Sequence, residues 1–377
     1  MTTHSGSLPR VAGGSDLKAV SRRALLAMPA LIGMAGSAGA EQTAGVQTLR
    51  IGMANSVMTV IYPYITNAQQ LGFFNQEGIN TEVLMGQGSP QILSLLVAGT
   101  ADLVFCNPEP MIQLHADRSL PIKSILVTLQ SQYRLTVSDD SPIHTVADLK
   151  GKRIGMFSPQ SGIDYLKARL QDSGLTVADI EIVPTGFGGQ TMMAVRQKQV
   201  DAILYWSDAL LMMRYSGLGL RELPRADWEQ GLYQYVAATT TTMIQEKPDV
   251  LRRALRAMVR GQMFFVIAPE MTVEAFWKQY PDQAPRSGDR EKAMDQNLVR
   301  VRDQANLIGL PPDWTRDQLM AHQWGQQSLS AWSRMQDNLL RVGSLTHKVD
   351  PATLFDDQFN AYANDFDRAK LFALAGK

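Results

Sequence analysis

The chain has 377 residues, of which 45% are hydrophobic and 19% are charged. This length suits one large or two medium domains, and the composition excludes a disordered chain. Lysine plus arginine equals aspartate plus glutamate at 36 each, so no basic excess points to a nucleic-acid partner. The single cysteine, Cys106, can form no internal disulfide, and a buried thiol is favoured over a nucleophile.

Residues 1–40 have the organisation of an export signal. Arg22 and Arg23 precede a short apolar stretch, and small residues ending at Ala40 form a cleavage site of the A-x-A type. The paired arginines predict a twin-arginine signal peptide that is cleaved near Ala40, and therefore a periplasmic protein. The alternative is a buried N-terminal helix, which Pro29 disfavours because it interrupts the apolar run. No later segment is long and apolar enough to span a bilayer.

After this signal, the first half of the chain alternates between predicted strands and helices. Strands are predicted at residues 49–54, 81–85 and 103–106, with helices at 61–71 and 90–98 between them. Gly72 and Gly99 follow the two helices, in the position where a glycine commonly ends a helix.

The next part of the chain repeats the first. Arg50-Ile51-Gly52-Met53 recurs as Arg153-Ile154-Gly155-Met156, and the glycine-rich turn at 86–90 has a counterpart at 186–190. The predicted strands are 153–157, 180–183 and 202–205, with helices at 162–171 and 190–196. Two such βαβαβ halves predict two α/β lobes, each with a parallel sheet covered on both faces.

Two extended segments are expected to connect the lobes, one at 125–137 and one at 233–243. The rest is predicted to be helical, at 250–268, 273–279, 291–308, 314–342 and 351–366. The expected domains are the first part of lobe one at 41–136, lobe two at 137–232, and the return crossover with the helical remainder of lobe one at 233–377. The fold class is therefore α/β, two-lobed, with a helical C-terminal extension.

In open α/β sheets, ligands bind beyond the carboxyl ends of the strands. Several loops at these ends lead into helices, whose first backbone N–H groups are free to bind a ligand. Glycines in the loops would let a ligand approach the backbone closely, although an ordinary tight turn is an alternative explanation for them. The predicted ligand-binding residues are Ser56, Val57, Met58, Tyr62, Gly88, Ser89, Asn107, Glu109, Ser158, Ser161, Asp164, Gly188, Gly189, Trp206 and Asp208.

Two acids occupy equivalent positions in the halves, because Glu109 and Asp208 each lie seven residues after an aspartate, Asp102 and Asp201. Acids with aromatic neighbours suit a ligand that has N–H donors or a positive charge, such as an aminopyrimidine or an amine, better than a bare anion. Solvated loop acids or helix caps are the alternative interpretation.

The sequence carries no H-E-x-x-H or G-x-S-x-G motif and no metal-ligand cluster, and none of its five histidines lies in a predicted cleft loop. We therefore expect a binding protein with no cofactor and no metal rather than an enzyme. Glu109 and Asp164 as an acid and base pair are the enzymatic alternative. A protein that binds ligand and signals is a third class.

Several stretches resemble the periplasmic substrate-binding proteins of nitrate/sulfonate/taurine-type ABC importers, a broad family that includes thiamine-precursor binders. They are Leu-Gly-Phe-Phe-Asn-Gln-Glu-Gly-Ile at 71–79, Ala-Gly-Thr-Ala-Asp at 98–102, residues 146–155, and the tail at 339–343 and 349–359. The resemblance covers nearly all of residues 48–366, and the order of the motifs is more specific than any one of them.

This resemblance implies a type II-like periplasmic-binding-protein fold that closes on its ligand by hinge motion. It implies delivery of a small molecule to ABC permease subunits, with membrane contact only through the permease. Asn-Pro-Glu-Pro at 107–110 resembles the thiamine-precursor branch, in which an acid meets a pyrimidine, and Asp208 matches a second acid there. The alternatives are a small organic anion (sulfonate, nitrate or aromatic carboxylate) and a thiamine-pyrimidine synthase-like enzyme, which the exported N-terminus disfavours.

Overall fold

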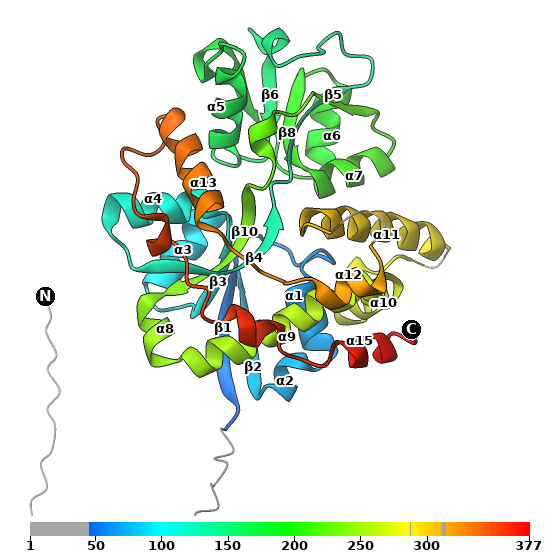
Figure 1. The fold of residues 1–377 in the computed structure, drawn as a ribbon. Coiled ribbons are helices and arrows are strands. Elements are labelled where there is room, and N and C mark those ends of the chain that lie inside the picture. Colours follow the sequence, from blue (N-terminus) through cyan, green and yellow to red (C-terminus); the bar gives the residue numbers. More distant parts are fainter. Residues whose placement is uncertain (1–44, 287, 311–313) are drawn as a thin grey trace, which may run out of the picture. The chain divides into compact units, whose positions relative to one another are not determined.

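Two five-stranded β-sheets organise the chain in the computed structural model, which describes residues 45–286, 288–310 and 314–377. The signal peptide expected at 1–40, with its cleavage near Ala40, lies outside the described residues. Residues 44–377 form one unit that contains both sheets (Figure 1).

The first sheet has the order β2-β1-β3-β10-β4 and the second has the order β7-β6-β8-β5-β9. The strands of the first sheet are β1 (Gln47–Met53), β2 (Ile79–Met85), β3 (Leu103–Cys106), β4 (Ile122–Gln130) and β10 (Tyr233–Thr240). Those of the second are β5 (Tyr133–Ser138), β6 (Arg153–Met156), β7 (Glu181–Pro184), β8 (Ala202–Trp206) and β9 (Leu220–Glu222). Each sheet, with the helices that cover it, is called the first or the second lobe below.

Each sheet is mixed, so the prediction of parallel sheets is wrong at one strand in each. β10 pairs antiparallel with β3 and β4, and β5 pairs antiparallel with β8 and β9. β5 and β10 each follow a segment in which the chain crosses from one lobe to the other. Each of them therefore enters its sheet from the opposite lobe and runs antiparallel to its neighbours. The chain changes sheets at residues 131–132. The lobe boundary expected after residue 136 therefore falls inside β5.

The internal repeat appears as matching contacts as well as matching strands. Arg50 at β1 donates to both carboxylate oxygens of Asp102, at 3.0 and 2.7 Å. Arg153 at β6 binds Asp201 in the same way, at 3.1 and 3.0 Å. In both lobes, a bidentate ion pair thus connects one parallel strand to the turn that precedes the neighbouring strand.

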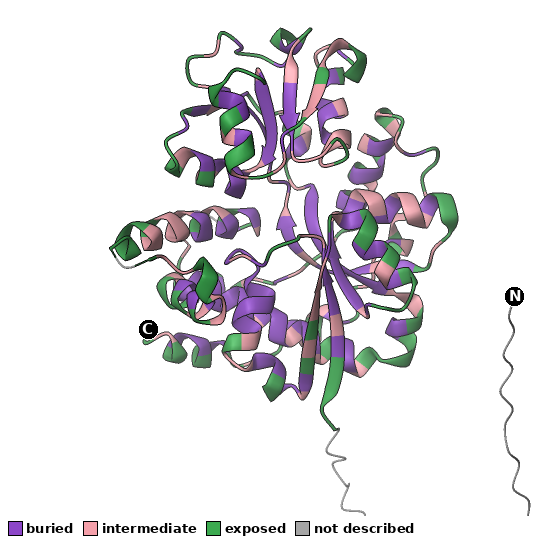
Figure 2. Cartoon of the chain, turned by 180° about the vertical axis from the view of Figure 1, so that it is seen from behind, coloured by how far each residue is buried: buried purple, intermediate pink, exposed green. Residues whose placement is uncertain are grey.

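Helices cover both faces of each sheet. One face of the first sheet packs on α1 (Pro63–Gln70), α9 (Pro248–Ile267) and α10 (Pro269–Gln279). The other face packs on α3 (Ser89–Val97), α4 (Pro108–Arg118) and α13 (Leu329–Arg341). In the second lobe, α5 (Ile163–Gln171) covers one face, and α6 (Gly189–Arg196) and α7 (Ser207–Tyr215) cover the other. Figure 2 shows the strands largely buried and the outer faces of the helices exposed.

Successive residues of a strand enter different cores, as the period of two requires. Leu103 and Phe105 of β3 belong to the core beneath α1 and α9, whereas Val104 and Cys106 belong to the core beneath α3 and α4. The Cys106 thiol is fully buried, so the prediction of a packed cysteine is confirmed.

The remaining helices belong mostly to the C-terminal part of the chain. They are α2 (Phe73–Gln76), α8 (Thr241–Glu246), α11 (Arg290–Leu307), α12 (Arg316–Ala321), α14 (Asn360–Asn364) and α15 (Arg368–Leu374). In the described residues, no helix combines the length and the apolar character that crossing a bilayer requires.

The helices predicted at 314–342 and 351–366 are shorter than expected. Residues 322–328 separate α12 from α13, because Gly325 has a positive φ of 76° and the Ser328 side chain caps the start of α13. Within 351–366, the structure has a single-turn 3₁₀ helix at Pro351–Thr353 and then α14. Likewise, the extended segment predicted at 233–243 ends at Thr240, whose hydroxyl caps α8.

The close contact between α9 and α1 generates a stability prediction. A Cβ atom at Gly261 would lie 2.5 Å from the Pro63 carbonyl oxygen and 3.0 Å from the Ala68 nitrogen, both backbone atoms. We expect Gly261→Ala to lower the free energy of unfolding by about 1–3 kcal/mol, measured by urea denaturation, despite the better helix propensity of alanine.

The control is Gly189→Ala, at the start of α6, where a Cβ atom would have no neighbour within 4 Å. This variant should be as stable as the wild type or slightly more stable. Equal stability of the two variants would contradict the packing argument.

Candidate functional site

A cleft of about 770 Å³ lies between the two lobes and is lined from both. This size is within the usual range of small-molecule sites. The first lobe contributes the loops that follow β1, β2 and β3, and the second lobe contributes the loop after β6 and the end of β8. Gly343 and Ser344, which follow α13 in the C-terminal tail, complete the lining. The carboxyl ends of the parallel strands therefore face the cleft, as expected for this class of sheet.

The structure brings together many of the residues predicted from the sequence. The predicted residues that line the cleft are Tyr62, Gly88, Ser89, Asn107, Glu109, Ser158, Ser161, Asp164 and Trp206. Asn107 precedes α4, and its backbone N–H donates to the Ser89 hydroxyl at 2.9 Å, so two of these loops hold each other in place. A ligand contact by any of these residues stays a prediction.

Ser56, Val57 and Met58 do not line the cleft. Ser56 and Val57 are exposed to solvent, and the loop that carries them reaches the cleft at its two ends, through Ala54 and Asn55 and through Ile61 and Tyr62. The Met58 side chain is buried in the first-lobe core, and its carbonyl accepts a 2.8 Å hydrogen bond from Gln283.

Gly188 and Gly189 also lie outside the cleft lining, although the equivalent Gly88 is part of it. The loop before α6 is bonded to its own lobe instead. The Tyr205 hydroxyl donates to the Gly186 carbonyl and also bonds to the Thr191 hydroxyl at 2.9 Å. Gly188 and Gly189 are therefore equivalent to the first-half loop in the sequence repeat, but they do not share its position in the cleft.

Asp208 is the main correction, because it is buried in an ion pair rather than directed at the cleft. Its carboxylate accepts from Arg300 of α11 at 3.1 Å, and both side chains are at least nine-tenths buried. The neighbouring Ser207 hydroxyl donates to Asp303 at 2.6 Å. α11 packs on the first-lobe core through Val301, so these contacts join the two lobes.

Sequence reasoning missed a group of amide and aromatic side chains in the lining. They are Asn55, Gln87, Gln91, Gln113, Gln132, Gln160 and Gln234, with Tyr133, Phe157, Tyr165 and Tyr235. Asn55, Gln87 and Phe157 adjoin predicted loops, so their position was a usable signal. Gln132 and Gln234 lie where the chain passes between the lobes. Ser344 had no local signal, since only tertiary packing brings the tail to the cleft.

Glu109 is the acid with the most perturbed pKa in the cleft. The pKa of its carboxyl group is raised to about 8, chiefly by burial and to a smaller extent by the negative charge of Asp164, while the hydrogen bond from its own backbone N–H opposes the rise. In the part of the chain that the structure describes, no basic side chain forms an ion pair with Glu109. This carboxyl group is therefore free to meet a ligand.

Asp164, in contrast, is engaged from three directions. It accepts from the Ser344 hydroxyl, from Gln113 at 3.4 Å, and pairs with Lys167 at 3.6 Å. Lys167 also donates to the Ser344 hydroxyl at 2.9 Å. Because Gln113 and Ser344 belong to the first lobe, Asp164 joins the lobes at the edge of the cleft.

The Arg300–Asp208 pair generates a second stability prediction. We expect Arg300→Met to destabilise the protein by about 3–5 kcal/mol in urea denaturation, because it leaves a buried carboxylate without its cation. Arg290→Met on the same helix is the control. Arg290 pairs with Glu274 at the surface, where both side chains are about half exposed, so its removal should cost less than about 1 kcal/mol. Similar losses in both variants would contradict the assigned role of Asp208.

The pKa of Glu109 predicts a pH-dependent stability. Between the usual value of 4.5 and about 8, the folded protein holds a proton that the unfolded chain has lost. The unfolding free energy should therefore fall as the pH rises through this window. Glu109→Gln should show a smaller loss between about pH 5 and pH 8 in urea titrations, since it has no proton to lose. The exposed-residue control Glu246→Gln should keep the wild-type loss, and an unchanged loss in Glu109→Gln would contradict the assignment.

Solved structures show the same fold as this chain. A protein of Bordetella bronchiseptica RB50 is 20% identical with a TM-score of 0.64, covering 84% of this chain and 97% of its own. The periplasmic aliphatic sulphonate binding protein SsuA of Escherichia coli is 18% identical with a TM-score of 0.59, covering 82% and 92%. The desulfurization enzyme DszB is 17% identical with a TM-score of 0.53, covering 84% and 98%. These similarities confirm the predicted two-lobed periplasmic-binding-protein fold.

Sequence comparison gives the family. A curated protein of Brucella abortus (strain 2308), named a binding protein without a stated ligand, is 21% identical over 212 residues, which are 55% of this chain. The chain spans 64% of the length of this relative. A family model described as NMT1/THI5 like matches residues 59–272. The chain therefore belongs to the NMT1/THI5-like family, and its resemblance to nitrate/sulfonate/taurine-type substrate-binding proteins is confirmed.

Proposed function

We propose that this protein is the solute-binding component of an ABC importer, which captures a small polar ligand between its lobes and delivers it to a membrane permease. The observation that carries the proposal is the cleft of about 770 Å³, lined by both lobes at their strand ends. The family and the sulfonate-binding neighbour support a binding role. A periplasmic location, reached through the twin-arginine signal at residues 1–40, is part of the same proposal.

The charges of the cleft favour a ligand with N–H donors or a positive charge over an anion. Among the described residues of the lining, Glu109 and Asp164 are the acids and Lys167 is the one base, already bonded to Ser344. Both acids lie in the first turn of a helix, α4 or α5, at the positive end of the helix dipole. A positively charged ligand would favour the ionised form of Glu109, whereas an anion would meet Asp164 and a Lys167 that is already paired with it.

Aromatic rings on both walls suit a flat ligand. In the first lobe, Tyr62 and Tyr235 lie with ring centroids 6.1 Å apart and planes 25° apart. In the second lobe, Phe157 meets Trp206 edge-on at 5.9 Å. Stacking on such rings, together with N–H donation to Glu109, favours a pyrimidine-like nitrogen heterocycle. The sulfonate-binding neighbour keeps a small organic anion as the second candidate.

Contacts between the lobes support a closing motion. On one side, α7 meets α11 through the Arg300–Asp208 pair. On the other side, Asp172 after α5 pairs with Arg341 of α13. These contacts span the two lobes and would break if the lobes separated, so the lobes are proposed to open and then close around a ligand.

We favour a binding protein over an enzyme, although DszB shares the fold. Among the described histidines, none lines the cleft, and His115 bonds to the Ile122 carbonyl at 3.2 Å and to Thr353. Cys106 is buried in the first-lobe core, where burial raises the pKa of its thiol and so disfavours a nucleophilic thiolate. An enzyme like the thiamine-pyrimidine synthases would need a lysine that holds its cofactor. Lys167, the lysine of the described cleft lining, is already paired with Asp164, which disfavours this alternative.

A thermal-shift screen tests the proposed function. The compounds are aminopyrimidines and aromatic amines in one set, and alkanesulfonates and aromatic carboxylates in the other. A ligand at a hundred times its Kd should stabilise the protein by about 2.7 kcal/mol, and small-angle scattering should show compaction. We expect hits in the first set. Hits in the second set alone would reverse the ligand assignment, and no hit in either would count against a small-molecule site of this kind.

The role of Glu109 is tested with the best hit of that screen. Glu109→Ala should weaken binding by about 1–3 kcal/mol in calorimetric titration, because a buried hydrogen bond to the ligand is lost. Val57→Ala is the control, since Val57 is 54% exposed and lies outside the cleft lining. Wild-type affinity in Glu109→Ala would remove this residue from the site.

A further inference from the structure

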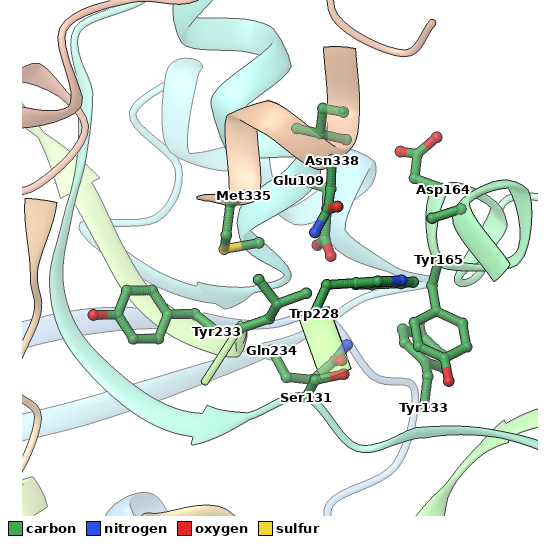
Figure 3. A pocket seen from close by; sticks show the side chains of 13 residues that line it. Glu109, Ser131, Tyr133, Asp164, Tyr165, Trp228, Tyr233, Gln234, Met335 and Asn338 are labelled. Atoms are coloured by element: carbon green, nitrogen blue, oxygen red, sulfur yellow. The ribbon is translucent and has the colours of Figure 1, made fainter. Parts of the chain in front are cut away.

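A small side pocket of about 30 Å³ adjoins the cleft at Glu109. The two cavities share Glu109, Tyr133, Asp164, Tyr165 and Gln234 in their linings. Beyond these residues, the side pocket continues between the return segment and α13. Figure 3 shows Trp228 at its wall and the side chains of Met335 and Asn338 projecting from α13. Because the two linings share these residues, a ligand in the cleft can extend a group into the side pocket, which therefore enlarges the proposed ligand site.

The volume limits what the pocket accepts. A cavity needs about 10–15 Å³ on this measure to hold one water molecule, so about 30 Å³ admits one or two groups of that size. A primary ammonium group or a methyl group fits. An aromatic ring, a sulfonate group or a trimethylammonium group is too large.

The polar atoms of the pocket select a donor of several hydrogen bonds. Glu109 has no cationic partner among the described residues, and the side chains of Ser131 and Gln234 add further acceptor oxygens, whereas the Asn338 amide oxygen already accepts from Arg341 at 3.2 Å. An ammonium group carries three N–H donors and a positive charge, so it can satisfy several of these acceptors at once. A methyl group would leave them without partners at a cost in free energy.

The aromatic wall of the pocket is held in place by its neighbours. The rings of Tyr165 and Trp228 lie 5.8 Å apart. The Tyr165 hydroxyl donates to Glu229 at 2.9 Å, and the Trp228 indole N–H donates to Asp172 at 2.6 Å. Each ring already has a guanidinium near it, because Arg341 lies 5.1 Å from the Trp228 ring centroid and Arg169 lies 6.0 Å from that of Tyr165. The rings therefore shape the pocket, and the preference for an ammonium group rests on its acceptor oxygens.

We propose that the side pocket binds the primary ammonium group of a ligand whose remaining part occupies the cleft between the lobes. This inference rests on the proposed function and adds a requirement to it, namely an aliphatic primary amine at one end of the ligand. Both passages between the lobes contribute to the pocket, through Ser131 and Tyr133 on the outward passage and Trp228 and Gln234 on the return. The ammonium group would therefore contact the segments about which the lobes move.

The test uses the full chain and a total extract of bacterial small molecules as the probe. After incubation and removal of unbound compounds, the protein is denatured and the released ligand is treated with dansyl chloride, which labels primary amines. Mass spectrometry should then show a released compound that carries a dansyl group. A released compound that takes no dansyl group overturns the ammonium pocket and leaves the binding function intact. No released compound at all overturns the proposed function itself, and this inference with it.

Two variants locate the amine in the side pocket. Ala168 and Ser131 line the side pocket and not the cleft, so Ala168→Leu should fill the pocket and Ser131→Ala should remove an acceptor. Each should reduce the amount of dansyl-reactive ligand by about tenfold or more while the urea midpoint stays within the folded range. Val57→Ala, outside both linings, should still release a dansyl-reactive compound. Wild-type capture by Ser131→Ala together with a correctly folded Ala168→Leu would overturn the assignment.

Discussion

The two passages of the chain between the sheets constrain the rest of the structure. β4 and β5 are separated only by residues 131–132, yet they belong to different sheets. A connection this short keeps one end of each sheet close to the other. The return through β10 does the same from the second lobe. Because the loops after β1, β3 and β6 all open toward these passages, their side chains line one shared cleft.

The charged groups at the lobe boundary divide into those that hold the lobes together and those left for a ligand. Asp208 is neutralised by Arg300, and Asp164 is engaged by Ser344 and Lys167. Glu109 alone among the acids of the described lining lacks a cation. Burial raises the pKa of this unpaired carboxyl group, and a positively charged ligand would favour its ionised form, which connects the electrostatics of Glu109 to the proposed ligand.

The internal repeat preserves the frame of the lobes more faithfully than their binding loops. The Arg50–Asp102 and Arg153–Asp201 pairs are the same contact made twice. The glycine-rich loops have diverged, since Gly88 lines the cleft and Gly188 does not. Strand pairing depends on local contacts that a duplication copies, whereas a loop's direction depends on neighbours such as Tyr205, which differ between the halves.

The sequence by itself determined the order of strands and helices in both halves, the burial of Cys106 and the loops at the strand ends, because these follow from local periodicity and glycine placement. Glu109 and Asp164 were identified in this way. The tertiary structure alone decided that Asp208 pairs with Arg300, which lies far along the chain on α11, and that Ser344 reaches the cleft. Such partners are set by packing between distant segments, and no local pattern in the sequence records which distant side chain will satisfy a buried charge.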